Sequence, residues 1–159
     1  MTGNPPNQRP IISLGLSPVL VAVELLGAIA ILLAVLLIIK FWAVLPDRIP
    51  IHFGLGGLAD AWGDKVTVWI MPVVAAIIFA LLTAVSRYPH TFNYPVPITS
   101  DNARRQYLLG RGLLVWLKAE ICWLLAFVVR QQILVALGNA QRFSIELLLG
   151  LVFFDIWDG

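Results

Sequence analysis

One segment gathers most of the side chains that could perform chemistry. Residues 45–65, LPDRIPIHFGLGGLADAWGDK, hold His52 together with Asp47, Asp60 and Asp64. Imidazole and carboxylate groups are metal ligands, but their spacing here matches neither the common zinc motifs nor a calcium-binding loop. The four glycines of the segment favour turns, in which aspartates bond to nearby backbone amides. We therefore interpret it as a hydrogen-bonded loop without metal or cofactor; recognition of a ligand or partner, and metal binding, are the alternatives.

Charged side chains inside the apolar runs are the second group of candidates. Glu24 lies about two turns into the first run, and Lys118 lies about two turns into the third. Because an isolated charge in hydrocarbon costs several kcal/mol, we predict an intramembrane Glu24–Lys118 ion pair. A structural clamp is the first interpretation, and a proton or substrate path is the alternative. We also expect Asp47 or Asp60 to meet Arg130 and so anchor the loop.

Catalytic motifs are absent from the sequence. It contains no GxSxG, HExxH, phosphate-loop or CxxC pattern. The two histidines, His52 and His90, flank opposite ends of the second apolar run and should lie on opposite sides of a membrane. Cys122 is the only cysteine, which excludes an internal disulfide. We predict that the protein is not an enzyme.

The composition indicates the scaffold that must hold these residues. Of the 159 residues, 60% are hydrophobic and 13% are charged, whereas soluble domains carry about 25% charged residues. The net charge of +2 is small and its basic residues are scattered, so no nucleic-acid surface is expected. The predicted fold is an all-α membrane protein: a bundle of about four transmembrane helices, with a structured polar loop between the first two.

Long apolar runs define the expected spans. A flexible tail, residues 1–16, should precede a single helical domain, residues 17–159. Ser17 and Pro18 favour a helix start, Pro46 a break and Gly138 a stop. The predicted spans are about residues 17–44, 66–86, 108–137 and 143–157. The last is short, and a half-inserted helix is the alternative there.

Orientation depends on the flanking basic residues. Lys and Arg divide equally between the two sides of the predicted bundle. The densest group, Arg104, Arg105 and Arg111, favours placing its side and the N-terminus in the cytoplasm. The loop of residues 45–65 would then face outward.

The same loop resembles the signature of the bacterial membrane family called domain of unknown function 1648. A second segment, residues 92–99, resembles that family's second block. The residues that carry the resemblance are Pro46, Ile49, Pro50, His52, Phe53, Gly57, Asp60, Gly63 and Lys65 in the first block, and Asn93, Tyr94 and Pro95 in the second. With Asp47 they form the predicted ligand- or partner-binding set.

The resemblance implies a multi-span membrane domain of the type found at the N-terminus of SdpI-like immunity proteins. Such proteins protect a bacterium from a toxin peptide and help signal by holding a repressor at the membrane. We expect this chain to lack the additional C-terminal spans of those proteins. No enzymatic activity or cofactor comes with the resemblance.

We therefore predict a small integral protein of the bacterial cell membrane, or of an internal membrane, that acts by binding. An immunity-like or signalling role through residues 45–65 is the first hypothesis. An accessory subunit of a larger membrane complex is the second. The expected partners are the lipid bilayer and either a membrane protein or a second copy of the chain, with no nucleic acid.

Overall fold

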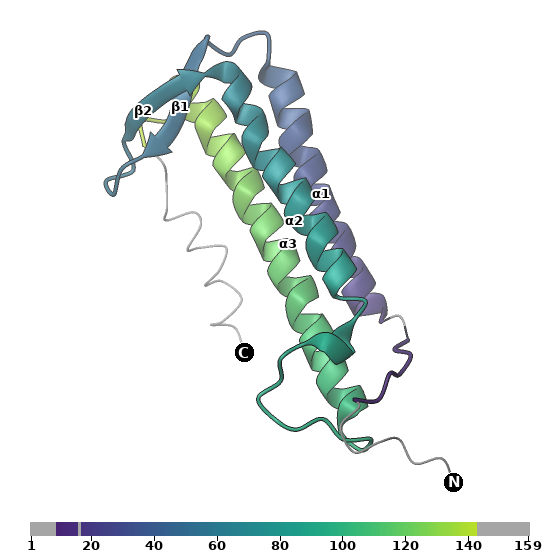
Figure 1. The fold of residues 1–159 in the computed structure, drawn as a ribbon. Coiled ribbons are helices and arrows are strands. Elements are labelled where there is room, and N and C mark those ends of the chain that lie inside the picture. The colour runs from purple at the N-terminus through teal and green to yellow at the C-terminus, as the bar shows by residue number, and fades with distance from the viewer. Residues whose placement is uncertain (1–8, 16, 143–159) are drawn as a thin grey trace, which may run out of the picture.

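The protein is a bundle of helices that carries a small β-hairpin at one end (Figure 1). The structure is a computed structural model and describes residues 9–15 and 17–142. Its elements, in chain order, are α1 (Pro18–Phe41), β1 (Arg48–Phe53), β2 (Ala59–Asp64), the 3-10 helix η1 (Lys65–Trp69), α2 (Ile70–Val85), the 3-10 helix η2 (Pro89–Thr91) and α3 (Ala103–Ala136).

In the described part of the chain, three helical segments are long and apolar enough to cross a membrane: Pro18–Phe41, Lys65–Val85 and Ala103–Ala136. The first is about 36 Å long, which exceeds the ~30 Å hydrocarbon core of a bilayer. The chain is thus a membrane-embedded protein. The predicted fourth span, residues 143–157, lies outside the described residues.

Two helix boundaries differ from the sequence prediction. The first helix ends at Phe41 instead of residue 44, because the chain tightens into a turn there: the Val44 amide bonds to the Phe41 carbonyl, three residues back, at 3.0 Å. The third helix begins at Ala103, ahead of the predicted span of about residues 108–137. Its first turn carries exposed Arg104 and Arg105, which lengthen the helix beyond its apolar part.

The prediction of an all-α fold with a polar loop is wrong between α1 and α2. There β1 and β2 pair antiparallel, with Arg48 opposite Asp64 and Pro50 opposite Trp62, and the register shifts after Pro50. Alternating apolar residues support the strands, and the irregular register accommodates a proline that cannot donate a ladder hydrogen bond. The glycines that suggested a loop instead build the turn and the close contacts of a hairpin.

Helix α3 is the central element, because α1 and α2 each contact it far more extensively than they contact one another. Small residues bring α1 close to it: a Cβ added at Gly27 would lie 3.3 Å from the Cα of Ala119. Ala30 and Ala34 are buried on the same face of α1. Close approach of small residues is the usual way in which helices associate in lipid, where packing replaces the hydrophobic effect.

The two ends of the bundle are built differently. At one end the hairpin rests on the C-terminal part of α3, since Ile49 and Pro50 are buried and the Gln132 Nε2 donates to the Pro50 carbonyl at 3.2 Å. At the other end the segment that contains η2 crosses the start of α3 (Figure 1). The two ends of the bundle therefore offer different surfaces.

Candidate functional site

The base of the hairpin is fixed to the bundle by several contacts. The Lys65 amide donates to the Asp47 carbonyl at 2.9 Å, and the Lys65 Nζ lies 3.6 Å from the Asp47 Oδ1. The same Nζ sits 5.3 Å from the ring centroid of Trp42. Asp64 accepts a hydrogen bond from the Val66 amide at 2.8 Å and so caps η1. These contacts hold the strands in one orientation above the helices.

The turn of the hairpin depends on glycines. Gly57 adopts φ 74° and donates to the Gly54 carbonyl at 2.8 Å, while the Gly54 amide donates to the Leu58 carbonyl at 2.9 Å. A Cβ at Gly63 would lie 2.9 Å from the Cγ2 of Ile51. Two glycines of the family signature, Gly57 and Gly63, thus have structural reasons to be glycine.

His52 and Asp60 face each other across the hairpin. The His52 Nδ1 lies 2.5 Å from the Asp60 Oδ1, and their side chains are 68% and 51% exposed. Such an exposed pair contributes little stability, because water screens it. Within the described ranges, no group of three or more His, Cys, Asp or Glu side chains could hold a metal ion. The geometry supports a cross-strand tie at this position.

The expected anchor between the loop and Arg130 is wrong. Asp47 is paired with Lys65, and Asp60 is paired with His52. Arg130 is exposed on α3. The hairpin is instead anchored by its own base and by the buried Ile49 and Pro50.

Most of the first signature block therefore builds the hairpin, and other residues form its exposed surface. Pro46 lies between α1 and β1, and Phe53 is half-buried at the end of β1. We define the hairpin surface as the four exposed apolar side chains Ile51, Leu55, Leu58 and Trp62. Leu55, at the turn, is fully exposed. Exposed apolar side chains on a fixed element are typical of binding surfaces.

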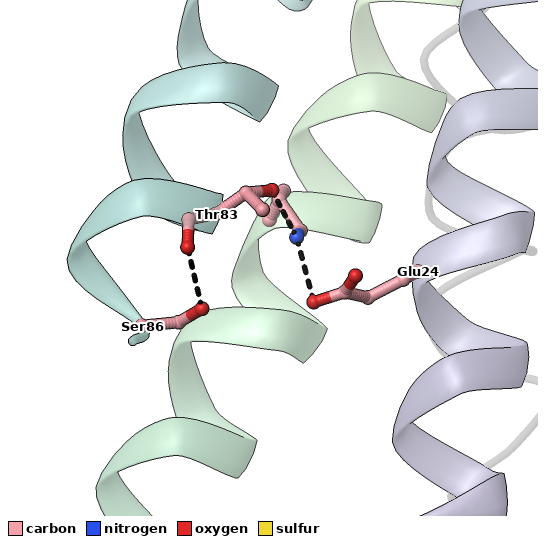
Figure 2. Close-up of polar contacts among 4 residues, drawn as sticks. Glu24, Thr83 and Ser86 are labelled. Atoms are coloured by element: carbon pink, nitrogen blue, oxygen red, sulfur yellow. Dashed lines mark hydrogen bonds and ion pairs between the residues drawn. The ribbon is translucent and has the colours of Figure 1, made fainter. Parts of the chain in front are cut away.

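A second candidate site lies inside the helix bundle and involves all three helices (Figure 2). Lys118 on α3 has a fully buried side chain. Its Nζ donates to the Glu24 Oε1 of α1 at 3.1 Å and to the Thr83 Oγ1 of α2 at 2.7 Å. The Phe79 ring centroid is 4.4 Å from the same nitrogen. The Ser86 hydroxyl continues the polar contacts by donating to the Thr83 carbonyl at 2.9 Å.

The arrangement around Lys118 fits a clamp. The two side chains that the sequence analysis paired, Glu24 and Lys118, lie in contact. Thr83 and Phe79 were not predicted as partners, although a hydroxyl one turn from the end of an apolar helix was a usable signal. With a carboxylate, a hydroxyl and an aromatic face around it, the buried ammonium group is well compensated. Its contacts join α1, α2 and α3 at one level.

The second signature block lies at the opposite end of the bundle from the hairpin. Asn93 and Pro95 are exposed, whereas Tyr94 is half-buried. The Tyr94 hydroxyl donates to the Pro89 carbonyl at 2.9 Å, and its ring centroid is 5.7 Å from that of Tyr107. Burial raises the pKa of Tyr94, the nearby Tyr107 raises it further, and the positive charge of Arg9 lowers it.

The N-terminal segment contributes to the same end. Arg9 donates through Nη1 to the carbonyls of His90 (3.2 Å) and Phe92 (2.5 Å), and its guanidinium carbon lies 5.8 Å from the Tyr94 ring centroid. The Tyr107 hydroxyl donates to the Pro10 carbonyl at 3.0 Å. Sequence analysis missed these contacts because they join segments more than 80 residues apart. The two signature blocks thus cannot form one binding surface.

Comparison with known proteins agrees with the resemblance for the first block. Residues 28–76 match the family model described as domain of unknown function (DUF1648). This segment comprises the second half of α1, the hairpin and the start of α2, so the similarity to this domain is centred on the hairpin. Residues 92–99 lie outside the matched range.

One relative, described as an uncharacterized protein from Archaeoglobus fulgidus, is 35% identical over 78 residues. The alignment covers 44% of this chain and 43% of that protein, so the chain spans less than half the length of its relative. No solved structure matches.

Proposed function

We propose that this protein acts in the membrane by binding, and that the hairpin surface of Ile51, Leu55, Leu58 and Trp62 contacts a membrane protein partner. The observation that carries the proposal is the exposure of these apolar side chains on an element whose base is fixed. A mobile loop could bury such groups against the bundle, but the base contacts hold this hairpin outward. A preformed surface loses little conformational entropy on binding.

The pairing of the hairpin's polar groups with one another favours binding over catalysis. In the described part of the chain the polar groups of the hairpin are engaged in its own construction: Asp47 with Lys65, His52 with Asp60, and Asp64 with the start of η1. An immunity-like or signalling role fits a binding surface of this kind. We place the N-terminus in the cytoplasm and the hairpin outside, because Arg104, Arg105 and Arg111 gather at the other end.

A second candidate role is that of an accessory subunit in a larger membrane complex. The observation that favours it is the low burial of α2, in which only Pro72 and Ala75 are buried in the described structure. A helix with this much free apolar surface can lie against lipid or against other subunits. A partner of fixed stoichiometry in native membranes would support this role, and a substoichiometric, condition-dependent partner would support signalling.

Copurification from native membranes tests the binding proposal. The combined variant Ile51→Ser, Leu55→Ser, Leu58→Ser should lose most of a partner that the unmodified protein retains. Val96→Ser is the matched control, since it removes an exposed apolar side chain at the opposite end of the bundle. Equal partner recovery with both variants would contradict the proposal.

A labelling experiment separates a protein partner from simple contact with lipid. Cys122 is fully buried, so a cysteine introduced at Leu55 provides one accessible thiol in the described part of the chain. A polarity-sensitive fluorophore at this position should report water in vesicles that contain only this protein. An apolar signal in these vesicles would show that the tip inserts into lipid, against the proposal.

Labelling of Asp60→Cys from outside intact cells tests the orientation.

A further inference from the structure

A carboxylate on the outer face of α3 has no partner in the described structure. Glu120 is exposed, and neither an ion pair nor a hydrogen bond joins it to another described residue. It lies two residues beyond Lys118, which at about 100° per residue places it on the opposite face of the helix. Lys118 and Glu120 are therefore neighbours in sequence with opposite environments.

Glu120 lies at the depth of the hydrocarbon. Contacts between the helices fix its level, because Lys118 meets Glu24 and Ala119 meets Gly27. Glu120 is thus about level with residues 26–28 of α1, roughly 12–15 Å from the start of that helix at Pro18. A bilayer core is about 30 Å thick, so the carboxylate lies well inside it.

Exposed apolar side chains line helix α3 on both sides of Glu120. Leu109, Leu113, Trp116 and Trp123 are exposed on the same side of α3. Together with Glu120 they follow spacings of four, three, four and three residues, the pattern by which one helix packs along another. We call these five residues the Glu120 stripe. Trp116 and Trp123 flank the carboxylate, and their indole N–H groups are additional donors that lipid cannot satisfy.

A charged group in lipid is costly, and intramembrane carboxylates are generally paired or face a bundle interior. A second copy of the chain is a poor occupant of the stripe. Copies in one membrane share an orientation, so a two-fold contact would place Glu120 against Glu120 and repel. The cation of this chain at that depth, Lys118, is buried and engaged with Glu24.

We propose that the Glu120 stripe binds a transmembrane helix of another protein that carries a Lys or Arg at matching depth. The charge is complementary, and the flanking leucines and tryptophans provide exposed apolar surface on either side. This inference rests on the proposed binding function, and it adds a contact within the membrane to the one at the hairpin. It assigns a partner class: a membrane protein with a basic residue inside a span.

Full-length protein and synthetic helices in phosphatidylcholine vesicles provide the test. The probes are leucine–alanine peptides of about 23 residues, long enough to span, with Lys, Leu or Glu at the centre. A central position keeps the charge near mid-depth in either orientation. Energy transfer from a donor on the protein, attached at Val96→Cys, to an acceptor on the peptide measures association.

The unmodified protein should bind the Lys peptide about tenfold more tightly than the Leu peptide. Glu120→Gln should remove this difference, and Glu120→Lys should reverse it in favour of the Glu peptide. Ile77→Gln, a polar change on the exposed face of α2, should leave the preference for the Lys peptide intact. Because Glu120 and Ile77 both face outward, none of these variants should disturb folding. Circular dichroism checks that each variant is folded.

Equal binding of the Lys and Leu peptides by the unmodified protein would overturn the proposal. Self-association of the protein that Glu120→Gln abolishes would also overturn it and assign the stripe to a second copy. Leu55→Ser should leave peptide binding unchanged. Failure of peptide binding would therefore count against the Glu120 stripe alone, and failure of partner copurification would count against the hairpin surface.

Discussion

Replacing Glu24 by Leu should destabilise the bundle, and a second replacement, Lys118→Met, should restore most of the loss. In the unmodified protein the Lys118 side chain is fully buried, and its ammonium group has two hydrogen-bond acceptors, Glu24 and Thr83. Glu24→Leu removes the countercharge and leaves Thr83 as the remaining acceptor. The double variant removes both charges and fills the space with apolar groups.

The expected magnitude follows from two bounds. Removing one partner of a buried ion pair costs about 3–5 kcal/mol in soluble proteins. Hydrogen bonds between membrane helices measure lower, about 0.6 kcal/mol on average and about 1.7 at most. Glu24 is 32% exposed, so the ion pair is not fully enclosed and its loss should cost less than the upper bound. We therefore expect Glu24→Leu to lower the free energy of unfolding by about 2–3 kcal/mol, with the double variant within about 1 kcal/mol of the unmodified protein.

Reversible unfolding in mixed micelles with increasing SDS measures these differences. The four proteins of the cycle are the unmodified chain, the two single variants and the double variant. Glu120→Leu is a matched control, because it removes a carboxylate at nearly the same depth from the outer face of α3. The free energy of unfolding of the Glu120→Leu protein, measured without any partner, should be unchanged or raised.

Additive losses in the double variant would refute the clamp, since they would mean that the two residues act independently. A Glu24→Leu protein as stable as the unmodified chain would refute it as well. Loss of a biological activity with unchanged stability would instead favour the proton or substrate path.

Three further predictions concern the two ends of the bundle. Gly63→Ala should expose the hairpin amides to faster hydrogen exchange, because its Cβ would meet Ile51 at 2.9 Å, and Ile51→Ala in the same chain should relieve this. Gly110→Ala should displace the Tyr94 ring, whose hydroxyl would lie 2.9 Å from the new Cβ; near-ultraviolet circular dichroism reports the change. Burial raises the pKa of Tyr94 in the folded protein above the ordinary tyrosine value of about 10. The stability that neutral Tyr94 contributes is therefore complete below pH ~10 and is lost as the pH rises through the pKa of the folded protein. Unfolding between pH 9 and 12 should show this loss, and Tyr94→Phe should reduce the pH dependence.

The sequence was a good guide to features that follow from depth in a membrane. The apolar runs predicted helices α1, α2 and α3 in the described chain. Counting turns from each helix start was enough to bring Glu24 and Lys118 together, because parallel helices of similar entry level align their residues. Such arithmetic needs no knowledge of side-chain packing.

The hairpin was harder to predict because its signals conflict. Pro50 argues against a strand, and Gly54, Gly57 and Gly63 suggest a loop. The alternation of Ile49, Ile51 and Phe53 favoured strands, but a two-stranded hairpin has little stability in isolation. It forms here because its base is clamped and its buried side rests on α3, and both are tertiary contacts.

The separation of the two signature blocks could be inferred only partly. A span between them predicts opposite sides of the membrane, yet the roles of the residues depend on folded contacts. Tyr94, for example, contacts Arg9 and Tyr107, which come from distant parts of the sequence. Residue type alone did not distinguish such packing from ligand binding.

Site-specific photocrosslinking in native membranes tests the central claim, that the hairpin surface binds a membrane protein. A photoreactive residue at Leu55 should give one discrete crosslinked protein, whereas the same group at Asp47, exposed at the hairpin base, should not. The Leu55 product should disappear when Ile51 and Leu58 are changed to serine. Crosslinks from Leu55 to lipid alone, or equal products from both positions, would contradict the account.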